Sequence, residues 1–184
     1  MARFDGLVIL ALAATGLLLA GCATDYSKKP APAIADATTV KDSAFDAQVR
    51  YTGPTLRTER RRGLFMDYHS VSLRSFVDKK SGQSTNQIYV VLSYVGGLRF
   101  YQTASFEGGV QRELLAIDRN VDFCNGGFCA YTETLGIQLT DAELESAVSG
   151  MKIRLNAKSG HESFIELPAN YVAGFLAAVP TDRQ

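Results

Sequence analysis

Two cysteines near the middle of the chain have the spacing of a disulfide across a hairpin tip. They lie in the segment Cys124-Asn125-Gly126-Gly127-Phe128-Cys129. If the two glycines are the central residues of a turn, Asn125 pairs with Phe128. The next pair outward is then Cys124 with Cys129, at a position where the two backbones come closest. A redox or metal site would need CxxC spacing or nearby His and Cys ligands, which the sequence lacks. The spacing therefore predicts a structural Cys124–Cys129 disulfide.

The two histidines are the next candidates for chemistry. His69 lies in Asp67-Tyr68-His69-Ser70, which offers an acid, a phenol, an imidazole and a hydroxyl. Consecutive strand residues alternate between faces, so these four cannot converge as a triad. His161 falls in a predicted turn, where we expect a solvated side chain. The sequence contains no nucleophile elbow, zinc-protease helix or phosphate-binding glycine loop, so we predict no catalytic residue, cofactor or metal.

Four arginines within six residues are the one unusual charge feature of the chain. They are Arg57, Arg60, Arg61 and Arg62. A guanidinium pairs with phosphate and carboxylate in bidentate geometry, so this run is a candidate anion-binding site. The alternative is a solvated strand edge, where arginine discourages aggregation. The whole chain has 19 basic and 19 acidic residues, and this balance predicts no nucleic-acid partner.

Most of the segments that must position these residues are expected to be strands. Runs of β-branched and aromatic residues bounded by glycine predict strands at 71–77, 88–95, 98–106, 114–123 and 128–139. The join Val95-Gly96-Gly97-Leu98 predicts a tight hairpin turn, because glycine reaches the positive φ that such a turn needs. The four-residue segment 140–143 is a capping box, and Gly150 is placed to end the helix that it begins.

The C-terminal part is predicted to end with a hairpin and a second helix. A three-residue loop at 159–161 would pair Leu155 with Ile165 and Ile153 with Leu167. The helix is expected to run from Ala169 to about residue 179, after Pro168. Together these elements predict an α+β, mainly β fold: an antiparallel β-sandwich or sheet with two short C-terminal helices.

The N-terminus has the pattern of an exported precursor. Residues 6–20 carry no charge and are too few for a membrane span of about 20 residues, but they match the core of a signal peptide. The next residues, Leu19-Ala20-Gly21-Cys22, resemble the lipobox of bacterial lipoproteins. In that group signal peptidase II cuts before the cysteine, which carries a diacylglyceryl group. We therefore expect a signal peptide at 1–21, lipidation of Cys22 and anchoring to a membrane.

The residues that follow set the expected domain organisation and location. The segment 22–44 is rich in Ala, Thr, Lys, Asp and Pro, so it is expected to be a lipidated, flexible tether. Residues 45–184 then form a single β-rich envelope domain. Ala23 stands where an aspartate would favour the inner membrane, so we expect an outer-membrane anchor on the periplasmic face. That compartment is oxidising, which agrees with the predicted disulfide.

The order of features from Phe123 to Val179 resembles a known family. A close cysteine pair is followed by a short helix ending in glycine, a polar-tipped hairpin and a closing helix with the run Gly174-Phe175-Leu176-Ala177-Ala178. This order is similar to the C-terminal half of the invasion-associated locus B family, small exported β-rich proteins of alphaproteobacteria. The resemblance implies a non-enzymatic envelope protein.

Two functions follow as hypotheses. The leading one is a membrane-anchored, non-catalytic binding or structural module with an envelope protein or an anionic glycan as its partner. The alternative is a cell-wall or lipid-directed hydrolase, because paired carboxylates cannot be recognised in a sequence. A deep cleft with converging acids, His69 or arginines would favour the enzyme, and a filled core with an exposed patch would favour the binding module.

Overall fold

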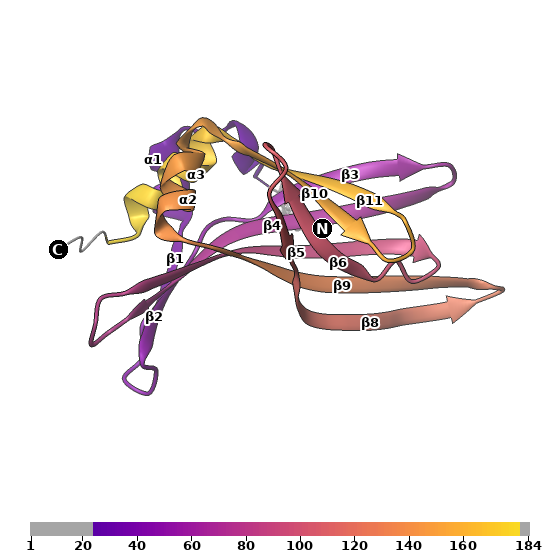
Figure 1. The fold of residues 1–184 in the computed structure, drawn as a ribbon, viewed down its shortest axis with the longest axis horizontal. Coiled ribbons are helices and arrows are strands. Elements are labelled where there is room, and N and C mark those ends of the chain that lie inside the picture. Colours follow the sequence, from indigo (N-terminus) through magenta and orange to yellow (C-terminus); the bar gives the residue numbers. More distant parts are fainter. Residues whose placement is uncertain (1–23, 181–184) are drawn as a thin grey trace, which may run out of the picture.

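Two antiparallel β-sheets face each other, and three short helices gather at one end of the pair (Figure 1). The structure is a computed structural model that describes residues 24–180, so the predicted signal peptide and Cys22 lie outside the described residues. The sandwich-like, mainly antiparallel β fold confirms the predicted fold class, with two of the helices in the C-terminal region.

The larger sheet has the strand order β1-β2-β4-β5-β9-β8, and β3 also pairs with β4. Its strands are β1 (Thr39–Lys41), β2 (Gln48–Thr52), β3 (Leu56–Arg62), β4 (Phe65–Asp78), β5 (Ser84–Gly96), β8 (Leu115–Asn125) and β9 (Phe128–Leu139). The smaller sheet has the order β11-β10-β6-β7, from β6 (Tyr101–Phe106), β7 (Gln111–Glu113), β10 (Met151–Ala157) and β11 (Glu162–Leu167). Strand β4 is long enough for β3 and β2 to pair end to end along the same edge of it, β3 with residues 65–71 and β2 with residues 74–78.

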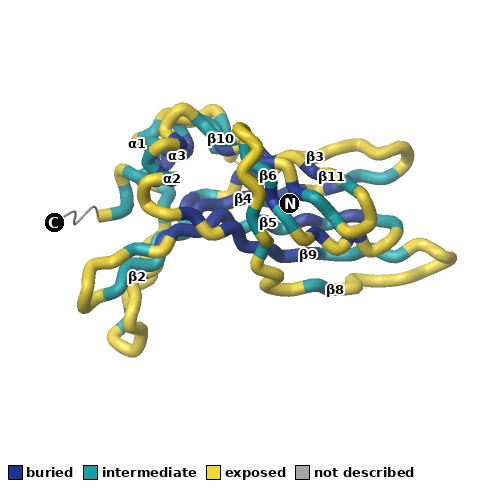
Figure 2. The backbone as a smooth tube through the Cα atoms, viewed as in Figure 1, coloured by how far each residue is buried: buried dark blue, intermediate teal, exposed yellow. Residues whose placement is uncertain are grey.

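The core lies between the two sheets and beneath the helices. Figure 2 shows the buried backbone concentrated in the central strands β4, β5 and β9. Alternate residues of these strands face inward, as the period of two requires. The apolar ones without exposed surface are Leu73, Ile88, Val90, Leu92, Leu135 and Ile137, and they meet Ile153 and Leu155 of the smaller sheet.

The C-terminal helices form where the sequence predicts them. Helix α2 (Asp141–Ser146) begins with the predicted capping box: Thr140 accepts from the backbone of Glu143, whose side chain accepts from the Thr140 backbone. A short 3₁₀ helix, η2 (Ala147–Ser149), extends it to Gly150 at φ 96°. Helix α3 (Ala169–Ala178) follows Pro168. Within the described residues, none of the helices combines the length and apolar character needed to cross a membrane.

The predicted hairpin turn at Gly96 and Gly97 is wrong. Strand β5 pairs with β4 and β9 in the larger sheet, whereas β6 pairs with β10 and β7 in the smaller one. The chain therefore uses this segment to cross between the sheets, with Gly96 at φ 131° and Phe100 at φ 61°. Glycine at positive φ serves a tight hairpin turn and this inter-sheet crossover alike, so the glycine pair does not distinguish the two in the sequence.

The C-terminal hairpin forms, but its predicted register is wrong by two residues. Strand β10 sets Ile153 opposite Ile165 and Leu155 opposite Ser163. The loop contains Gly160 at φ 82°, and the backbone N–H of Ala157 donates to the carbonyl of His161. Gly160 therefore occupies the last loop position, which requires the left-handed conformation, and not the middle one. A shift of two residues keeps every side chain on its predicted face.

The expected tether at residues 22–44 is also wrong over its described part. A 3₁₀ helix, η1 (Tyr26–Lys28), and helix α1 (Ala31–Ala37) pack on α3, and Ile34 has no exposed surface. The side-chain amide of Asn170 donates to the Ser27 carbonyl at 3.1 Å and to the Lys29 carbonyl at 2.6 Å. The folded domain therefore begins near residue 25 and not near residue 45.

Candidate functional site

Polar side chains meet between the sheets beside the β5–β6 crossover. Asp67 and His69 lie two residues apart on β4, so both face inward and are buried, while Tyr68 between them is half exposed on the other face. The sequence prediction that these neighbours cannot converge as a triad agrees with this alternation. The structure instead brings Asp67 to an arginine that the sequence analysis did not single out.

Arg99, in the crossover, forms a buried ion pair with Asp67. Its Nη2 lies 2.6 Å from Asp67 Oδ2, and its guanidinium stacks over the Tyr94 ring at 4.0 Å. Its Nη1 donates to the Tyr101 hydroxyl at 3.3 Å, and that hydroxyl lies 2.6 Å from the Ser163 hydroxyl. The pair thus ties β4 of one sheet to β6 and β11 of the other.

Glu133 on β9 has no exposed surface and holds the crossover in place. Its carboxylate accepts the backbone N–H groups of Phe100 and Tyr101, each at 3.0 Å, and the Tyr94 hydroxyl. Arg119 of β8 completes the set, with Nε at 2.9 Å. Burial of Tyr94 and its hydrogen bond to Glu133 raise the pKa of the Tyr94 hydroxyl above its ordinary value of 10. The carboxylate is fully occupied and stabilises a left-handed turn at Phe100 that would otherwise be strained.

His69 is the least satisfied member of this region. Neither ring nitrogen has a hydrogen-bond partner among the described residues, and the same holds for Asp67 Oδ1. Burial, followed by the nearby charge of Arg60, lowers the pKa of His69 from 6.5 to about 4. The imidazole is therefore neutral at pH 7. No hydroxyl or thiol of the described residues is hydrogen-bonded to either ring nitrogen, so the arrangement is not that of a general base paired with a nucleophile.

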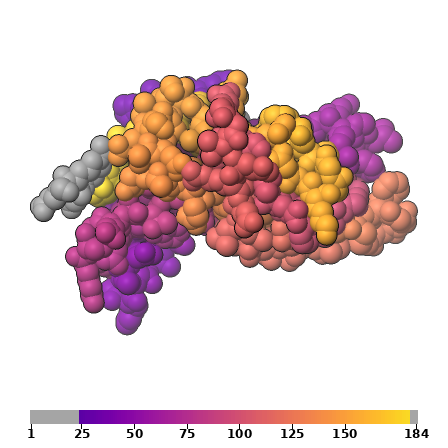
Figure 3. All heavy atoms as spheres, viewed as in Figure 1, coloured from indigo at the N-terminus to yellow at the C-terminus, as the bar shows by residue number. Residues whose placement is uncertain are grey.

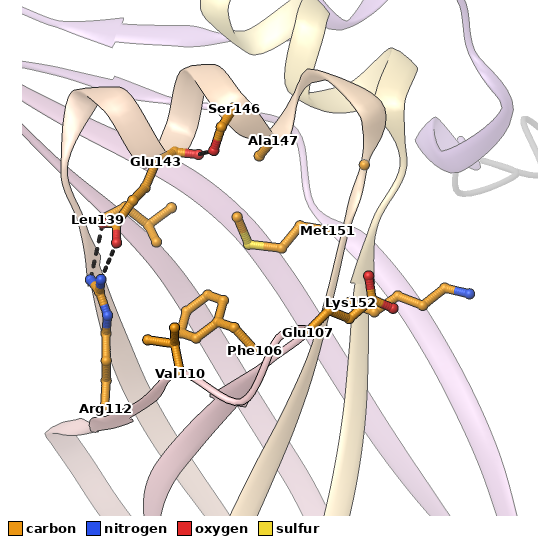
Figure 4. A pocket seen from close by; sticks show the side chains of 11 residues that line it. Phe106, Glu107, Val110, Arg112, Leu139, Glu143, Ser146, Ala147, Met151 and Lys152 are labelled. Carbon is orange, nitrogen blue, oxygen red and sulfur yellow. Dashed lines mark hydrogen bonds and ion pairs between the residues drawn. The ribbon is translucent and has the colours of Figure 1, made fainter.

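A separate pocket of about 300 Å³ lies between the β6–β7 turn, α2 and the start of β10 (Figure 4). Phe106 and Met151 line its floor, and Arg112 pairs with Glu143 on one wall. Glu143 also caps α2 through the Thr140 backbone N–H, which together with Arg112 lowers the pKa of this carboxyl. Of the two acids that line the pocket, Glu107 and Glu143, the second is thus engaged twice, in a helix cap and in an ion pair.

The four predicted anion-binding arginines do not form one patch. They lie on β3, where Leu56 is buried, so Arg60 and Arg62 point to the same side as Leu56, toward the smaller sheet. Arg60 Nη2 donates to the Phe164 carbonyl at 3.3 Å, and Arg62 Nη2 donates to the Val95 carbonyl at 3.2 Å. The guanidinium groups of these two arginines therefore donate to backbone carbonyls of neighbouring strands.

Arg57 and Arg61 lie on the other face of β3. Both are exposed, and neither has an ion pair or hydrogen bond with another described residue. Strand β3 is also an edge strand, because only β4 pairs with it. The run therefore contains two structural arginines and two that remain available to an anion.

The cysteine pair lies where its spacing predicts. Asn125 pairs with Phe128, Cys124 pairs with Cys129, and the two glycines between them adopt φ of 58° and 84°. The cysteine Cα atoms are 4.0 Å apart and the sulfur atoms are bonded. The disulfide closes the tip of the β8–β9 hairpin.

Neither the described residues nor a comparison with known proteins points to a further site. Among residues 24–180, no three His, Cys, Asp or Glu side chains gather in a way that could hold a metal ion. Comparison of the chain with family models, curated proteins and solved structures gives no match. The resemblance to the invasion-associated locus B family therefore stays a prediction.

Sequence reasoning missed Glu133, Arg99 and Arg119. A usable signal was present for the first of these. Glu133 is followed by Leu135, Ile137 and Leu139 at a period of two, which are inward positions of a buried strand. An acid in such a series must be paired. The partners Arg99 and Arg119 carry no comparable signal, because their approach depends on how the crossover folds.

Proposed function

We propose that the protein is a non-catalytic binding module, anchored by lipid on Cys22 to the periplasmic face of the outer membrane, that binds an anionic envelope component. The observation that carries the proposal is the division of charges between interior and surface. The buried acids Asp67 and Glu133 are each held by an arginine, whereas Arg57 and Arg61 remain exposed on an edge strand. The interior charges serve the fold, and the surface charges are left for a ligand.

The pairing of the buried acids with arginine also argues against the hydrolase alternative. Glycoside hydrolysis needs one carboxyl that can donate a proton and a second that is free to attack or to activate water. Glu133 already accepts from two backbone amides, a tyrosine and an arginine. Glu143 is engaged as a helix cap. No observation favours the enzyme enough to propose it.

The anchor would hold the domain close to the membrane. Only Ala23 and Thr24 separate Cys22 from Asp25, whose side chain caps η1. Three residues of extended chain reach about 11 Å. We therefore propose that the end bearing α1 and α3 faces the anchoring membrane and that the molecule has little freedom to swing.

The arginine proposal is tested with the mature chain, residues 22–184, carrying Cys22→Ser so that lipid does not contribute. Binding to peptidoglycan sacculi and to lipopolysaccharide is measured against salt. We expect binding that weakens as salt rises, because exposed charges are screened over about 10 Å at 0.1 M. The double variant Arg57→Ser, Arg61→Ser should bind more weakly. The control Lys41→Ser, Arg50→Ser removes the same charge from exposed positions on β1 and β2 and should bind like the wild type.

Metabolic labelling with a fatty-acid probe tests the anchor. The wild-type precursor should take up label, and Cys22→Ser should neither be labelled nor cut before residue 22, because the thiol is the acyl acceptor. Equal label in both proteins would refute the lipoprotein assignment.

A further inference from the structure

Two hairpin tips meet at the end of the molecule that lies farthest from the helices (Figure 1). One is the β3–β4 turn at Gly63 and Leu64, and the other is the β8–β9 turn closed by the disulfide. The rings of Phe65 and Phe128 lie 5.4 Å apart, so the two tips are in contact. Figure 3 shows both tips protruding side by side at this end. They form one composite feature, which we call the distal tip.

The distal tip is apolar at its extremity and cationic directly behind it. Leu64 is 99% exposed and Phe128 is 54% exposed. Arg61 and Arg62 immediately precede the β3–β4 turn; Arg62 is held by the Val95 carbonyl, and Arg61 is exposed. Because the contact between Phe65 and Phe128 joins the two turns, these side chains form one apolar feature, and a contiguous exposed apolar patch marks an interaction surface.

A comparison within the molecule shows that charge separates this tip from an ordinary exposed residue. Phe45, in the β1–β2 loop, is also 99% exposed. That loop holds Asp46 and Asp42, and Asp42 is paired with Lys79, so its charges are balanced and it presents no free arginine to an anionic surface. Of the two apolar residues that are 99% exposed among the described residues, only Leu64 lies beside an arginine run.

The size of the feature favours a lipid surface over a protein. A stable protein interface needs about 800 Å² from each partner, which the side chains of two narrow turns do not supply. A bilayer needs no matched surface of that kind. Apolar side chains enter the boundary between headgroups and acyl chains, and guanidinium groups bind the phosphates above it.

We propose that the distal tip docks on an anionic lipid bilayer, with Leu64 and Phe128 inserted and Arg61 at the headgroups. The proposal rests on the proposed anion-binding function and names its partner as the phosphate of a lipid surface. Because the tip lies at the end opposite the helices that the anchor holds at its membrane, the bilayer that the tip contacts is a different one. The disulfide keeps the turn that carries Phe128 narrow.

The test uses the non-lipidated mature chain described above and vesicles of phosphatidylethanolamine with about one third phosphatidylglycerol, in sedimentation assays. Wild type should bind these vesicles and should not bind phosphatidylcholine vesicles. Leu64→Ser should lower the partition coefficient about tenfold, since a leucine that leaves water contributes roughly this factor. The matched control Phe45→Ser removes an equally exposed apolar residue at the other end and should leave binding unchanged.

A fluorescence measurement reports insertion directly. Leu64→Cys gives a single free thiol, because Cys22 is replaced and the other two cysteines are bonded. An environment-sensitive dye on this thiol should shift to the blue with anionic vesicles, and the same dye on Phe45→Cys should not. Thermal melts of every variant check that the fold is retained.

The outcomes separate the two proposals. Salt-sensitive vesicle binding without a shift at residue 64 and without an effect of Leu64→Ser overturns tip insertion and leaves anion binding by the arginines standing. Binding to sacculi without binding to vesicles has the same consequence. Absence of binding to vesicles, sacculi and lipopolysaccharide overturns both.

Discussion

Gly174 of α3 lies directly against Ile34 of α1. A Cβ atom placed on Gly174 would come within 2.5 Å of the Ile34 Cβ and would collide with the Ala31 carbonyl oxygen. Glycine is therefore required here by space and not by backbone conformation. This contact fixes the N-terminal segment to the C-terminal helix.

Gly174→Ala should lower the free energy of unfolding by about 1–3 kcal/mol, because an added methyl in a closed contact forces the two helices apart. Thermal unfolding measures the loss. Hydrogen exchange should rise first in residues 31–37. Gly97→Ala is the matched control, since a Cβ there meets open space, and it should be nearly neutral. Equal stability of both variants would show that α1 does not pack on α3.

Glu133→Gln should destabilise the protein by about 3 kcal/mol or more. The change removes the charge that balances Arg119 and directs an amide donor at groups that themselves donate. Chemical denaturation measures the effect. Glu162→Gln is the control, because its pair with Arg154 is about half exposed, and such surface pairs contribute about 1 kcal/mol or less. If both variants lose the same small amount, Glu133 does not hold the crossover.

The fold class could be predicted because strand alternation, glycine turns and helix caps are local signals. The capping box at Thr140 and the Cys124–Cys129 pair each depend on six or fewer consecutive residues. The tether prediction failed for the opposite reason. Residues 31–37 contain one strongly apolar residue, Ile34, and their helix is stabilised by Gly174, which is remote in the sequence. No local pattern reveals that contact.

The polar cluster could be predicted only in part. Strand alternation places Asp67 and His69 on one face and divides the arginines of β3 between two faces. The partners of these residues depend on the crossover after β5, which the sequence represents as an ordinary glycine turn. Arg99 follows that turn by two residues, and its pairing with Asp67 needs the chain to pass from one sheet to the other.

His69 should make the protein sensitive to mild acid. Its pKa is about 4 in the folded protein and 6.5 when unfolded, so the unfolded chain binds a proton more readily. The stability is fully present above pH 6.5 and is lost as pH falls toward 4, by up to about 3 kcal/mol. Denaturation midpoints measured between pH 7 and pH 4 should decline accordingly.

The variant His69→Leu identifies the source of that decline. It removes the titrating group and its unpartnered nitrogens, so stability between pH 6.5 and 4.5 should become nearly constant. His161→Gln should change the slope less, because burial and the nearby arginines lower that pKa on a more exposed ring. Carboxyl groups with lowered pKa, such as those of Asp78 and Glu143, change the stability only at lower pH. An unchanged slope in His69→Leu would refute the assignment.

The Cys124–Cys129 disulfide should be structural and only modestly stabilising. The bond joins residues five apart, and closing so short a ring restricts the unfolded chain by at most about 2 kcal/mol. Mass spectrometry of the non-reduced protein taken from the envelope should find the two cysteines linked. Reduction should lower the melting temperature by a few degrees, about 2–4 °C per kcal/mol for a domain of this size, and leave the far-UV circular dichroism unchanged. Free thiols in envelope protein would contradict the pairing, because opposed cysteines in an oxidising compartment have no reason to stay reduced.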